Sequence, residues 1–258
     1  MAEARKGFQF FRRDFLFGAL AGGAATAGTG LLMPIEWHQK VLPEGNQLVF
    51  GQCGEDLLVS QLFQHLQIDK PSYMDVGAYH PTIGSNTYNL YRSGSRGTLI
   101  EPNVDMIADL KSKRPEDQVL NIGIGLGEEG EADFYVLNYP QLNTFDEEEA
   151  KTRVANSGGK LRIDRVVKMP LVDINRIIRE NHGDKAPDFL SVDTEGLDFS
   201  ILKTLDFSKY RPMVICAETV QYSTLKSIDT IGDLLKENGY VLRCQTIANS
   251  IYLRKDLL

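Results

Sequence analysis

Short apolar runs separated by polar stretches recur along the chain and predict buried β-strands. These runs are Tyr73–Val76, Thr98–Ile100, Gln118–Ile122, Phe189–Val192 and Arg211–Glu218. Helical spacing or a capping residue marks six further segments: Leu57–Leu66, Asn86–Tyr91, Val104–Lys113, Ile174–Asn181, Phe199–Leu205 and Ile228–Lys236. Strands that alternate with helices in this way predict one α/β domain.

The stretch Tyr73–Asn103 contains the clearest functional pattern. It predicts a strand, a polar loop, a short helix and a second strand that ends at Glu101. The first strand runs into the small residues Gly77 and Ala78. A βαβ unit with a small-residue first turn and an acid at the end of its second strand is typical of a nucleoside-cofactor site. Glu101 is then placed to bind ribose hydroxyls.

The loop of this unit narrows the choice of cofactor. A dinucleotide site needs three closely spaced glycines, so that backbone amides can approach a pyrophosphate. Here Tyr79, His80 and Pro81 stand between Gly77 and Gly84, and Pro81 has no amide hydrogen to donate. The loop therefore favours S-adenosylmethionine, which has a ribose but no phosphate, over a nicotinamide cofactor. An ordinary βαβ unit without a cofactor is the alternative for this stretch alone.

A second group of polar residues follows the predicted strand Phe189–Val192. Asp193 and Glu195 come directly after this strand, and Gly123 follows the strand Gln118–Ile122. Ligands of open α/β sheets bind at the carboxyl ends of the strands. We therefore expect these residues to lie at one edge with Asp75 and Glu101. A glycine at position 123 would let an adenine ring approach closely.

Methyl transfer to a hydroxyl needs a positioned acceptor and a base that removes its proton. Asp193 is the first candidate for this base, followed by Glu195 and His80. As an alternative, Asp193, Glu195 and Asp198 together could hold Mg²⁺ or another hard cation, although our prediction contains no metal. Asp198 is also the best candidate to cap the helix Phe199–Leu205.

Composition excludes several classes of function. The 258 residues carry a formal charge of −7, and 42% of them are hydrophobic, which is enough for a sizeable core. Acidic character argues against a nucleic-acid surface, which needs clustered Lys and Arg. The three cysteines are scattered, and the four histidines lack ligand spacing. The sequence therefore predicts neither a disulfide framework nor a zinc site.

The N-terminal segment has a composition of its own. Phe11-Arg12-Arg13-Asp14-Phe15-Leu16 is similar to a twin-arginine export signal, and a Gly- and Ala-rich stretch follows it. We predict a signal or anchor segment over residues 1–33, a linker over 34–49 and the catalytic domain over 50–258. A flexible leader without either role is the third alternative. Export or membrane association conflicts with the cytoplasmic supply of S-adenosylmethionine, so the sequence leaves localisation open.

Five motifs in a fixed order carry a resemblance to a known family. They are Gln52-x-Gly54-Glu55-Asp56, Tyr73-x-Asp75-Val76-Gly77-Ala78, Ser85-Asn86-Thr87, Gly97-x-Leu99-Ile100-Glu101-Pro102-Asn103 and Ser191-Val192-Asp193-Thr194-Glu195-Gly196. Over about residues 50–255 the chain resembles the FkbM-type S-adenosylmethionine-dependent methyltransferases. The resemblance implies a class I methyltransferase fold, a Rossmann-like three-layer sandwich with a mostly parallel seven-stranded sheet and an antiparallel C-terminal strand. Val241–Gln245 and Ser250–Arg254 would form its closing hairpin.

The resemblance also implies roles for individual residues. The segment Asp75, Gly77, Ala78 and Tyr79 would contact the methionine part of the cofactor, Glu101 its ribose, and Ile122 and Gly123 its adenine, with Asn103 in the same set. The implied reaction is transfer to an oxygen of a small-molecule or glycan acceptor, such as a sugar or a secondary metabolite. A non-catalytic exported binding or structural module that reuses the fold is the alternative. The acceptor and the oligomeric state are left open.

Overall fold

The computed structural model describes residues 48–221, 226–227 and 229–258, and no side chains are described for residues 220–229. The described residues belong to one compact unit, Leu48–Leu258. The predicted signal or anchor segment and nearly all of the predicted linker lie outside them, so those assignments and the localisation stay predictions. Within the described part of the chain, no helix has both the length and the apolar character that a membrane span requires.

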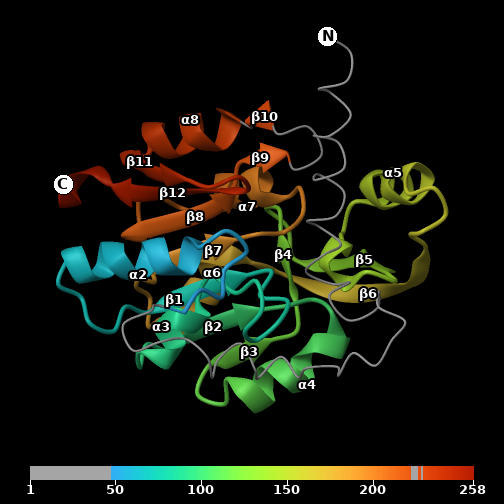
Figure 1. Ribbon diagram of the computed structural model, residues 1–258, viewed down its shortest axis with the longest axis horizontal. Helices are drawn as coiled ribbons and strands as arrows, with labels where there is room; N and C mark the ends of the chain where they lie inside the picture. Colours follow the sequence, from blue (N-terminus) through green and yellow to red (C-terminus); the bar gives the residue numbers. More distant parts are fainter. Residues whose placement is uncertain (1–47, 222–225, 228) are drawn as a thin grey trace, which may run out of the picture. The chain divides into compact units, whose positions relative to one another are not determined.

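Seven strands form the central sheet, in the order β11–β12–β8–β7–β1–β2–β3 (Figure 1). Their bounds are β1 Tyr73–Val76, β2 Gly97–Ile100, β3 Gln118–Leu120, β7 Phe189–Val192, β8 Val214–Glu218, β11 Tyr240–Gln245 and β12 Asn249–Arg254. Neighbouring strands are parallel except at β12, which runs antiparallel to both β8 and β11. The predicted class I arrangement is confirmed, and each strand of the closing hairpin begins one residue earlier than predicted.

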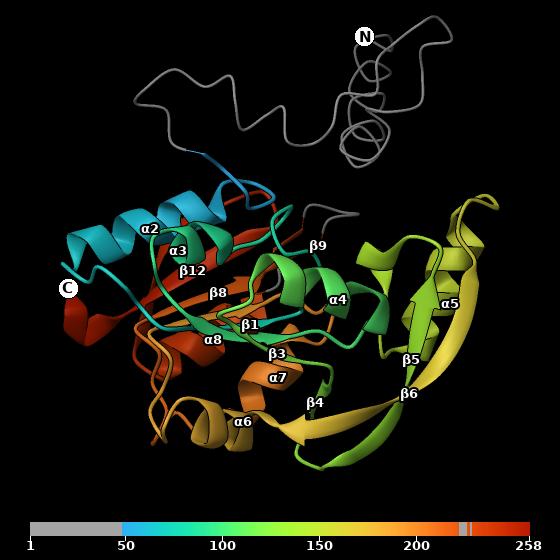
Figure 2. The same cartoon turned by 90° about the horizontal axis from the view of Figure 1, so that it is seen from below.

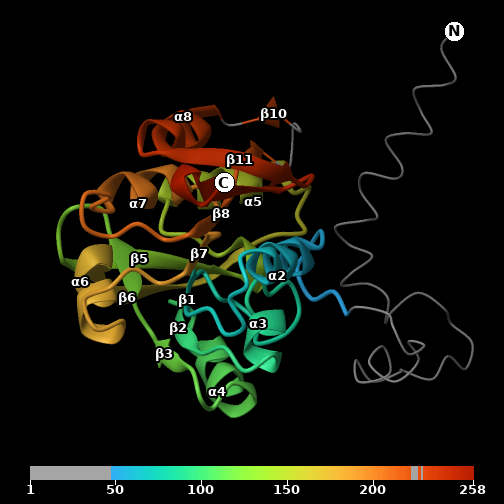
Figure 3. The same cartoon turned by 90° about the vertical axis from the view of Figure 1, so that its left-hand side faces the viewer.

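Helices cover both faces of this sheet (Figures 2 and 3). Their bounds are α2 Glu55–His65, α3 Tyr88–Arg92, α4 Val104–Lys113, α6 Ile174–Asn181, α7 Asp198–Thr204 and α8 Asp229–Glu237. Side chains alternate along a strand. Tyr73 of β1 therefore packs toward α2, α3 and α4, whereas Met74 packs toward α6, α7 and α8. The predicted three-layer sandwich follows from this alternation.

A second sheet of three strands, in the order β4–β6–β5, is inserted between β3 and α6 (Figure 1). Its elements are β4 Gly123–Gly125, β5 Gly130–Leu137, the 3₁₀ turn η2 Pro140–Leu142, α5 Glu147–Asn156 and β6 Ile163–Asp173. A short hairpin of β9 Val220–Gln221 and β10 Lys226–Ser227, and the terminal turn η3 Lys255–Leu257, complete the described elements. One face of the inserted sheet packs on α5 through Tyr135 and Leu137.

The predicted strand Gln118–Ile122 is wrong at its end. β3 stops at Leu120, and Gly123 starts β4, where it pairs with Leu171 of the second sheet. Between them, Nδ2 of Asn121 donates to the backbone oxygens of Glu101 and Pro102 at 2.8 and 2.9 Å. The side chain of Asn121 thus contacts the carbonyl groups that follow β2, and β3 extends no further.

Aspartate side chains cap α5 and α6 at their N-termini. Asp146 and Asp173 accept from the backbone amides of Glu149 and Arg176 and so cap α5 and α6, as predicted for Asp173. The predicted cap at Asp198 is wrong. Asp198 is the first residue of α7, and its carboxylate accepts instead from the amide and hydroxyl of Thr194.

Arg114 organises a polar network beneath β1. Its Nε donates to Asp117 at 2.7 Å, and both side chains are fully buried. Its Nη2 donates to the hydroxyl oxygens of Tyr73 and Thr87, each at 2.9 Å. The Thr87 hydroxyl in turn donates to Asp75 Oδ2 at 2.7 Å. One guanidinium group therefore links two buried acidic side chains.

The Ser85-Asn86-Thr87 motif contributes three side chains to this region. Ser85 Oγ lies 3.3 Å from Nη1 of Arg114, and Nδ2 of Asn86 donates to Ser191 Oγ of β7 at 3.2 Å. All three motif residues are buried. The motif therefore joins β1, β7 and α4 beneath the sheet's carboxyl edge.

Replacing Thr87 by valine should destabilise the protein by about 2–4 kcal/mol, because the isosteric change removes the hydroxyl that accepts from Arg114 and donates to Asp75. Urea denaturation of the purified domain measures this loss. Ser95→Ala is the matched control, since Ser95 Oγ is buried and has no hydrogen-bond partner. That variant should stay within about 0.5 kcal/mol of the parent. Equal effects of the two substitutions would contradict the network.

Candidate active site

Most of the candidate site residues lie at the carboxyl edge of the central sheet. Tyr73, Leu99, Phe189 and Val214 all face the α2, α3 and α4 layer. Asp75 of β1 and Glu218 of β8 face the same layer, because side chains alternate along a strand. Gly77, Glu101 and Asp193 follow directly after β1, β2 and β7, at the same edge of the sheet. The structure therefore brings these positions together, whereas Gly123 belongs to the inserted sheet.

Gly77 lies where the loops after β1, β2 and β7 contact one another. The amides of Gly77 and Ala78 both donate to the backbone oxygen of Ile100, at 3.0 and 3.1 Å. The amide of Asp193 donates to Val76 at 3.0 Å. Gly77 has a φ of +85°, and a Cβ atom there would lie 1.9 Å from the backbone oxygen of Asp193. Only glycine fits this position.

Glu101 holds the loop that follows β1. It is 5% exposed. Its Oε2 accepts from the amide of Tyr79 and its Oε1 from the amide of Asn103, both at 2.7 Å. Burial raises the pKa of Glu101 to about 7, although the two amides lower it. Each carboxylate oxygen keeps a further lone pair, so the side chain can still accept from a diol.

Tyr79 adopts a left-handed backbone conformation, with a φ of +46°. This conformation is uncommon for a residue other than glycine and costs free energy. The hydrogen bond from its amide to Glu101 offsets part of that cost. The loop is therefore preorganised by Glu101.

Asp75 lies beneath this loop. It is buried, and Thr87 donates to its Oδ2. Burial raises its pKa, whereas the Thr87 hydroxyl and the charge of Arg114 lower it. The contacts show Asp75 as a support for the loop, and a direct contact with a cofactor stays a prediction.

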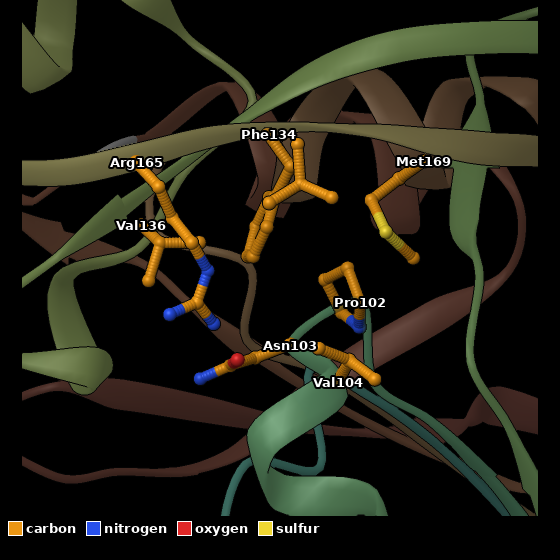
Figure 4. Close-up of a pocket in the computed structure, with 8 residues that line it drawn as sticks. Pro102, Asn103, Val104, Phe134, Val136, Arg165 and Met169 are labelled. Carbon is orange, nitrogen blue, oxygen red and sulfur yellow. The ribbon is translucent and has the colours of Figure 1, made fainter.

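Asn103 combines a capping role with an unused donor. Its Oδ1 accepts from the amide of Asp105 at 3.2 Å and caps α4. Its Nδ2 is buried without a hydrogen-bond partner. Figure 4 shows Asn103 beside Pro102 and Val104, facing the inserted sheet. An orphaned donor beside Glu101 is a feature that a bound ligand would explain.

Gly123 has a packing reason in the structure. A Cβ atom there would lie 2.5 Å from the ring of Phe145 and 2.8 Å from Leu171. Ile122 packs against the core on the α6, α7 and α8 face. Phe145 thus occupies the space beside Gly123, and contact of Ile122 and Gly123 with adenine stays a prediction.

Acidic side chains crowd the ends of β7 and β8. Burial raises the pKa of Asp193 well above its usual value, and the nearby carboxylates of Glu195 and Glu218 raise it further. Burial also raises the pKa of Glu218 to about 8 and that of Asp198 to about 6. For Asp198, hydrogen bonds from Thr194 act in the opposite direction. The group therefore contains carboxyls that exchange protons near neutral pH.

Arg153 is a cation beside this acidic group, and no local pattern in the sequence points to it. It comes from α5, and its Nη2 lies 3.0 Å from Glu195 Oε2. Its Nε donates to Glu149 and its Nη1 to the backbone oxygen of Leu142. Glu195 has a φ of +56°, and Arg153 lowers its pKa against the larger effect of burial. The inserted sheet therefore contributes directly to the edge of the site.

His80 has a structural role in the loop. Its Nδ1 accepts from the amides of Thr82 and Ile83, at 3.1 and 2.9 Å. Burial lowers its pKa, so the neutral ring with hydrogen on Nε2 is favoured. The only acceptor nitrogen is then in use. This geometry favours Asp193 over His80 as the base.

No group of three or more His, Cys, Asp or Glu side chains in the described residues is arranged to hold a metal ion. The alternative prediction placed a hard cation among Asp193, Glu195 and Asp198. The guanidinium of Arg153 lies beside Glu195, next to that place.

The sequence profile of the methyltransferase FkbM domain matches residues 75–242, well over half of the chain. This protein belongs to the FkbM methyltransferase family. The matched range includes Asp75, Glu101, Asp193 and the whole inserted sheet. The resemblance seen in the motifs is thereby confirmed, and no curated protein matches the chain significantly.

Solved structures of other methyltransferases resemble this FkbM domain distantly. One, assigned as a caffeoyl-CoA O-methyltransferase of Staphylococcus aureus, has 12% identity and a TM-score of 0.44, with 93% of this chain and 90% of that chain covered. A ribosomal protein L11 methylase of Lactobacillus delbrueckii subsp. bulgaricus has 10% identity, a TM-score of 0.42 and 78% coverage of each chain. A TehB-like SAM-dependent methyltransferase of Corynebacterium glutamicum has 10% identity and a TM-score of 0.41, with 82% and 90% covered. The fold assignment rests on the strand order.

The cofactor of this FkbM methyltransferase is S-adenosylmethionine, and the residues at the sheet edge fit it. Glu101 offers a carboxylate for the ribose diol, and Gly77 leaves the loop without a side chain where it meets Asp193. Asn103 supplies an unpaired donor next to Glu101. These features are those of a nucleoside site without a phosphate cradle.

Binding of S-adenosylhomocysteine should strengthen as the pH rises from 6 to 8, because ribose hydroxyls donate to the ionised form of Glu101. With a pKa of about 7, only about a tenth of Glu101 is ionised at pH 6, so affinity should fall by about tenfold there. Isothermal titration calorimetry measures the affinity. In Glu101→Gln, binding should be weaker and its dependence on pH reduced. An unchanged affinity and pH profile in this variant would contradict the assignment.

The ligand-free protein should lose stability as the pH rises from 6.5 to 8. Glu101 and Glu218 have folded-state pKa values of about 7 and about 8, above the ordinary value of 4.5. The folded state therefore binds more protons than the unfolded state in this window, and each group contributes at most about 1.4 kcal/mol per pH unit. Thermal denaturation should show a lower Tm at pH 8, with a smaller decrease in Glu218→Gln. A rise in Tm with pH would disprove this assignment.

Proposed function

We propose that this protein transfers the methyl group of S-adenosylmethionine to a hydroxyl oxygen of a sugar or secondary-metabolite acceptor. The observation that carries the proposal is Asp193, a carboxyl group at the carboxyl edge of the sheet whose pKa is raised by burial and by Glu195 and Glu218. A carboxylate with a raised pKa accepts a proton more readily than an ordinary one. It lies next to Gly77, at the loop that would hold the cofactor.

Each residue at the edge has a separate task in this proposal. The bound cofactor supplies an electrophilic methyl group. Asp193 would accept the proton of the acceptor hydroxyl as the oxygen–carbon bond forms and the carbon–sulfur bond of the cofactor breaks, which would leave S-adenosylhomocysteine. Glu195, held by Arg153, stays beside Asp193 and favours its protonation. Glu101 fixes the ribose through its carboxylate oxygens.

The acidic group also supports a polyhydroxylated acceptor. Asp193 and Glu218 have no hydrogen bonds from other side chains among the described contacts, so their oxygens are available to hydroxyl groups. The Nη groups of Arg153 already donate to Glu195 and to the backbone oxygen of Leu142. Carboxylates that accept from several hydroxyls favour a sugar-like small molecule or a glycan. The alternative of a non-catalytic module gains no support from the family match.

Asp193→Asn should lower the turnover of methyl transfer by about 10²- to 10⁴-fold while S-adenosylhomocysteine still binds, because the amide keeps the shape but accepts no proton. The assay combines purified protein, S-adenosylmethionine labelled in its methyl group and a panel of hydroxylated sugars and metabolites. Mass spectrometry and NMR identify the methylated atom. Asp69→Asn is the control, since Asp69 is exposed before β1, at the opposite edge of the sheet.

Three results would overturn parts of this proposal. Full activity of Asp193→Asn would remove Asp193 as the base. A label on nitrogen or carbon of every converted acceptor would exclude O-methylation. Absence of S-adenosylhomocysteine binding in the parent protein would exclude the methyltransferase activity itself.

A further inference from the structure

Three segments meet at one corner of the carboxyl edge of the central sheet. They are Val49–Gly54 before α2, Tyr79–Ser85 after β1 and the turn Thr246–Ala248 between β11 and β12. We call them the rim segments. Figures 1 and 3 show the chain before α2 next to the tip of the β11–β12 hairpin. Segments that are far apart along the chain therefore share one surface.

A buried acid and a β-bridge hold the rim segments together. Glu55 has no exposed surface. Its Oε2 accepts from the amide of Cys53 and its Oε1 from the hydroxyl of Thr246, both at 2.7 Å. Gly51 pairs with Gly84 in an isolated parallel bridge. Glu55, an acid of the first sequence motif, therefore helps to fix the shape of the rim.

The rim segments border the candidate active site. The amide of Thr219, directly after Glu218, donates to the backbone oxygen of Ala248 at 3.2 Å. The amide of Tyr79 donates to Glu101. One rim segment therefore adjoins the acidic group, and another belongs to the cofactor loop. A surface that binds the rim segments lies close to the site of the reaction.

Each rim segment exposes one branched aliphatic side chain to water. Val49 is 51% exposed, Ile83 46% and Ile247 53%. Ile83 and Ile247 lie where the chain turns. Single exposed aliphatic side chains are ordinary on a protein surface, but three of them around one fixed corner form a patch. Such a patch indicates an interaction surface.

The rim segments also lack charge. They contain no Lys, Arg, Asp or Glu, although 24% of the residues in the whole chain are charged. Burial lowers the pKa of His80 and raises that of Cys53 to about 11, so both side chains are neutral at pH 7. Arg92 borders the rim, with its guanidinium 5.2 Å from the centre of the Phe50 ring. Apolar side chains with a cation beside them match a bilayer, in which hydrocarbon lies below phosphate groups.

The chain reaches the domain at this same corner. The described residues begin at Leu48, next to Val49. The signal or anchor segment predicted over residues 1–33 is joined to the domain here, so membrane attachment of that segment would act on the rim. A soluble partner would also cover the aliphatic side chains, but it would explain neither the absence of charge nor this connection.

We infer that the rim segments dock on the surface of a lipid bilayer, with Val49, Ile83 and Ile247 inserted among the lipids. Docking places the carboxyl edge of the central sheet against the lipid headgroups. The acceptor hydroxyl is then carried by a glycolipid headgroup, a step that rests on the proposed function. Docking itself requires no methyl transfer.

Tryptophan fluorescence measures the insertion directly. The sequence contains one tryptophan, Trp37, so Trp37→Phe provides a background for Ile247→Trp or Leu242→Trp. Leu242 is the matched control, since it is 52% exposed on β11 outside the rim. The full chain is mixed with vesicles of phosphatidylcholine that is brominated in its acyl chains. Quenching in the Ile247→Trp protein should be at least about twofold stronger than in the control, because only the rim enters the hydrocarbon.

Vesicle cosedimentation measures the contribution of the aliphatic side chains to binding. In the full chain, the pair Val49→Ser and Ile247→Ser should lower partition onto phosphatidylcholine vesicles by about tenfold, because it removes two of the three inserted side chains. Val166→Ser with Leu242→Ser is the control pair, at 48% and 52% exposure outside the rim. It should leave partition unchanged. Thermal denaturation should show an unchanged Tm for both pairs, since all four positions are exposed.

Methyl transfer to lipid tests the second part of the inference. Phosphatidylcholine vesicles that contain galactosyldiacylglycerol are incubated with methyl-labelled S-adenosylmethionine and the parent protein. Labelled glycolipid should form, and the variant with Val49→Ser and Ile247→Ser should form it about tenfold more slowly. Both proteins should act equally on free galactose, because these two residues are outside the catalytic group.

Several outcomes would overturn the inference. Docking fails if Ile247→Trp is quenched no more than Leu242→Trp, or if the two serine pairs change partition equally. A dimer that dissociates in the Val49→Ser and Ile247→Ser variant, without quenching in Ile247→Trp, would assign the rim to a second copy of the chain. Labelled galactose without labelled glycolipid would reject the acceptor step alone. If the parent protein binds no S-adenosylhomocysteine, the proposed function and the acceptor step fail, and quenching still decides docking.

Discussion

The buried ion pair of Arg114 and Asp117 is the interaction on which the rest of the structure depends. A guanidinium without access to water must have its donors paired, because an unpaired buried charge costs several kcal/mol. Tyr73, Thr87 and Ser85 provide the remaining partners and thereby fix the start of β1, the loop before α3 and the end of α4. Thr87 connects this network to Asp75 by a hydrogen bond. The network therefore also fixes the end of β1, the strand that leads into the cofactor loop.

Glu101 connects two loops at the carboxyl edge of the sheet. Both of its oxygens accept from backbone amides, one in the loop after β1 and one at the start of α4. A carboxyl with a pKa of about 7 is a costly way to connect two loops unless a ligand also uses the ionised form. Burial of Glu101 therefore has two results. It makes the ionised form of the side chain costly, and it places the carboxylate for its proposed role in ribose binding.

The sequence predicted the parts of the fold that depend on neighbours along the chain. Five strands of the central sheet and the acids that end them follow from periodicity and from the rule that parallel strands end at one edge, and the cap at Asp173 follows from residue type. The closing hairpin was implied by the family resemblance. The inserted sheet could not be assembled in this way, because β4 pairs with β6 across a long insertion. Arg153 was missed for the same reason: its partner Glu195 is 42 residues away. The packing reason for Gly123, which is its contact with Phe145, is likewise invisible in the sequence.

The course of β6 has a consequence for how such a protein can change over evolution. This strand of 11 residues is about 36 Å long, and it runs from the end of α5 directly into α6, whose isoleucines are embedded in the main core. β6 is therefore anchored in the main core at its α6 end, whereas its other end packs with α5 in a separate hydrophobic cluster. Its outer half, beside α5 and Arg153, can vary without disturbing the network under β1. Sequence change at that end would act on the acidic edge through Arg153 and would leave the loop held by Glu101 in place.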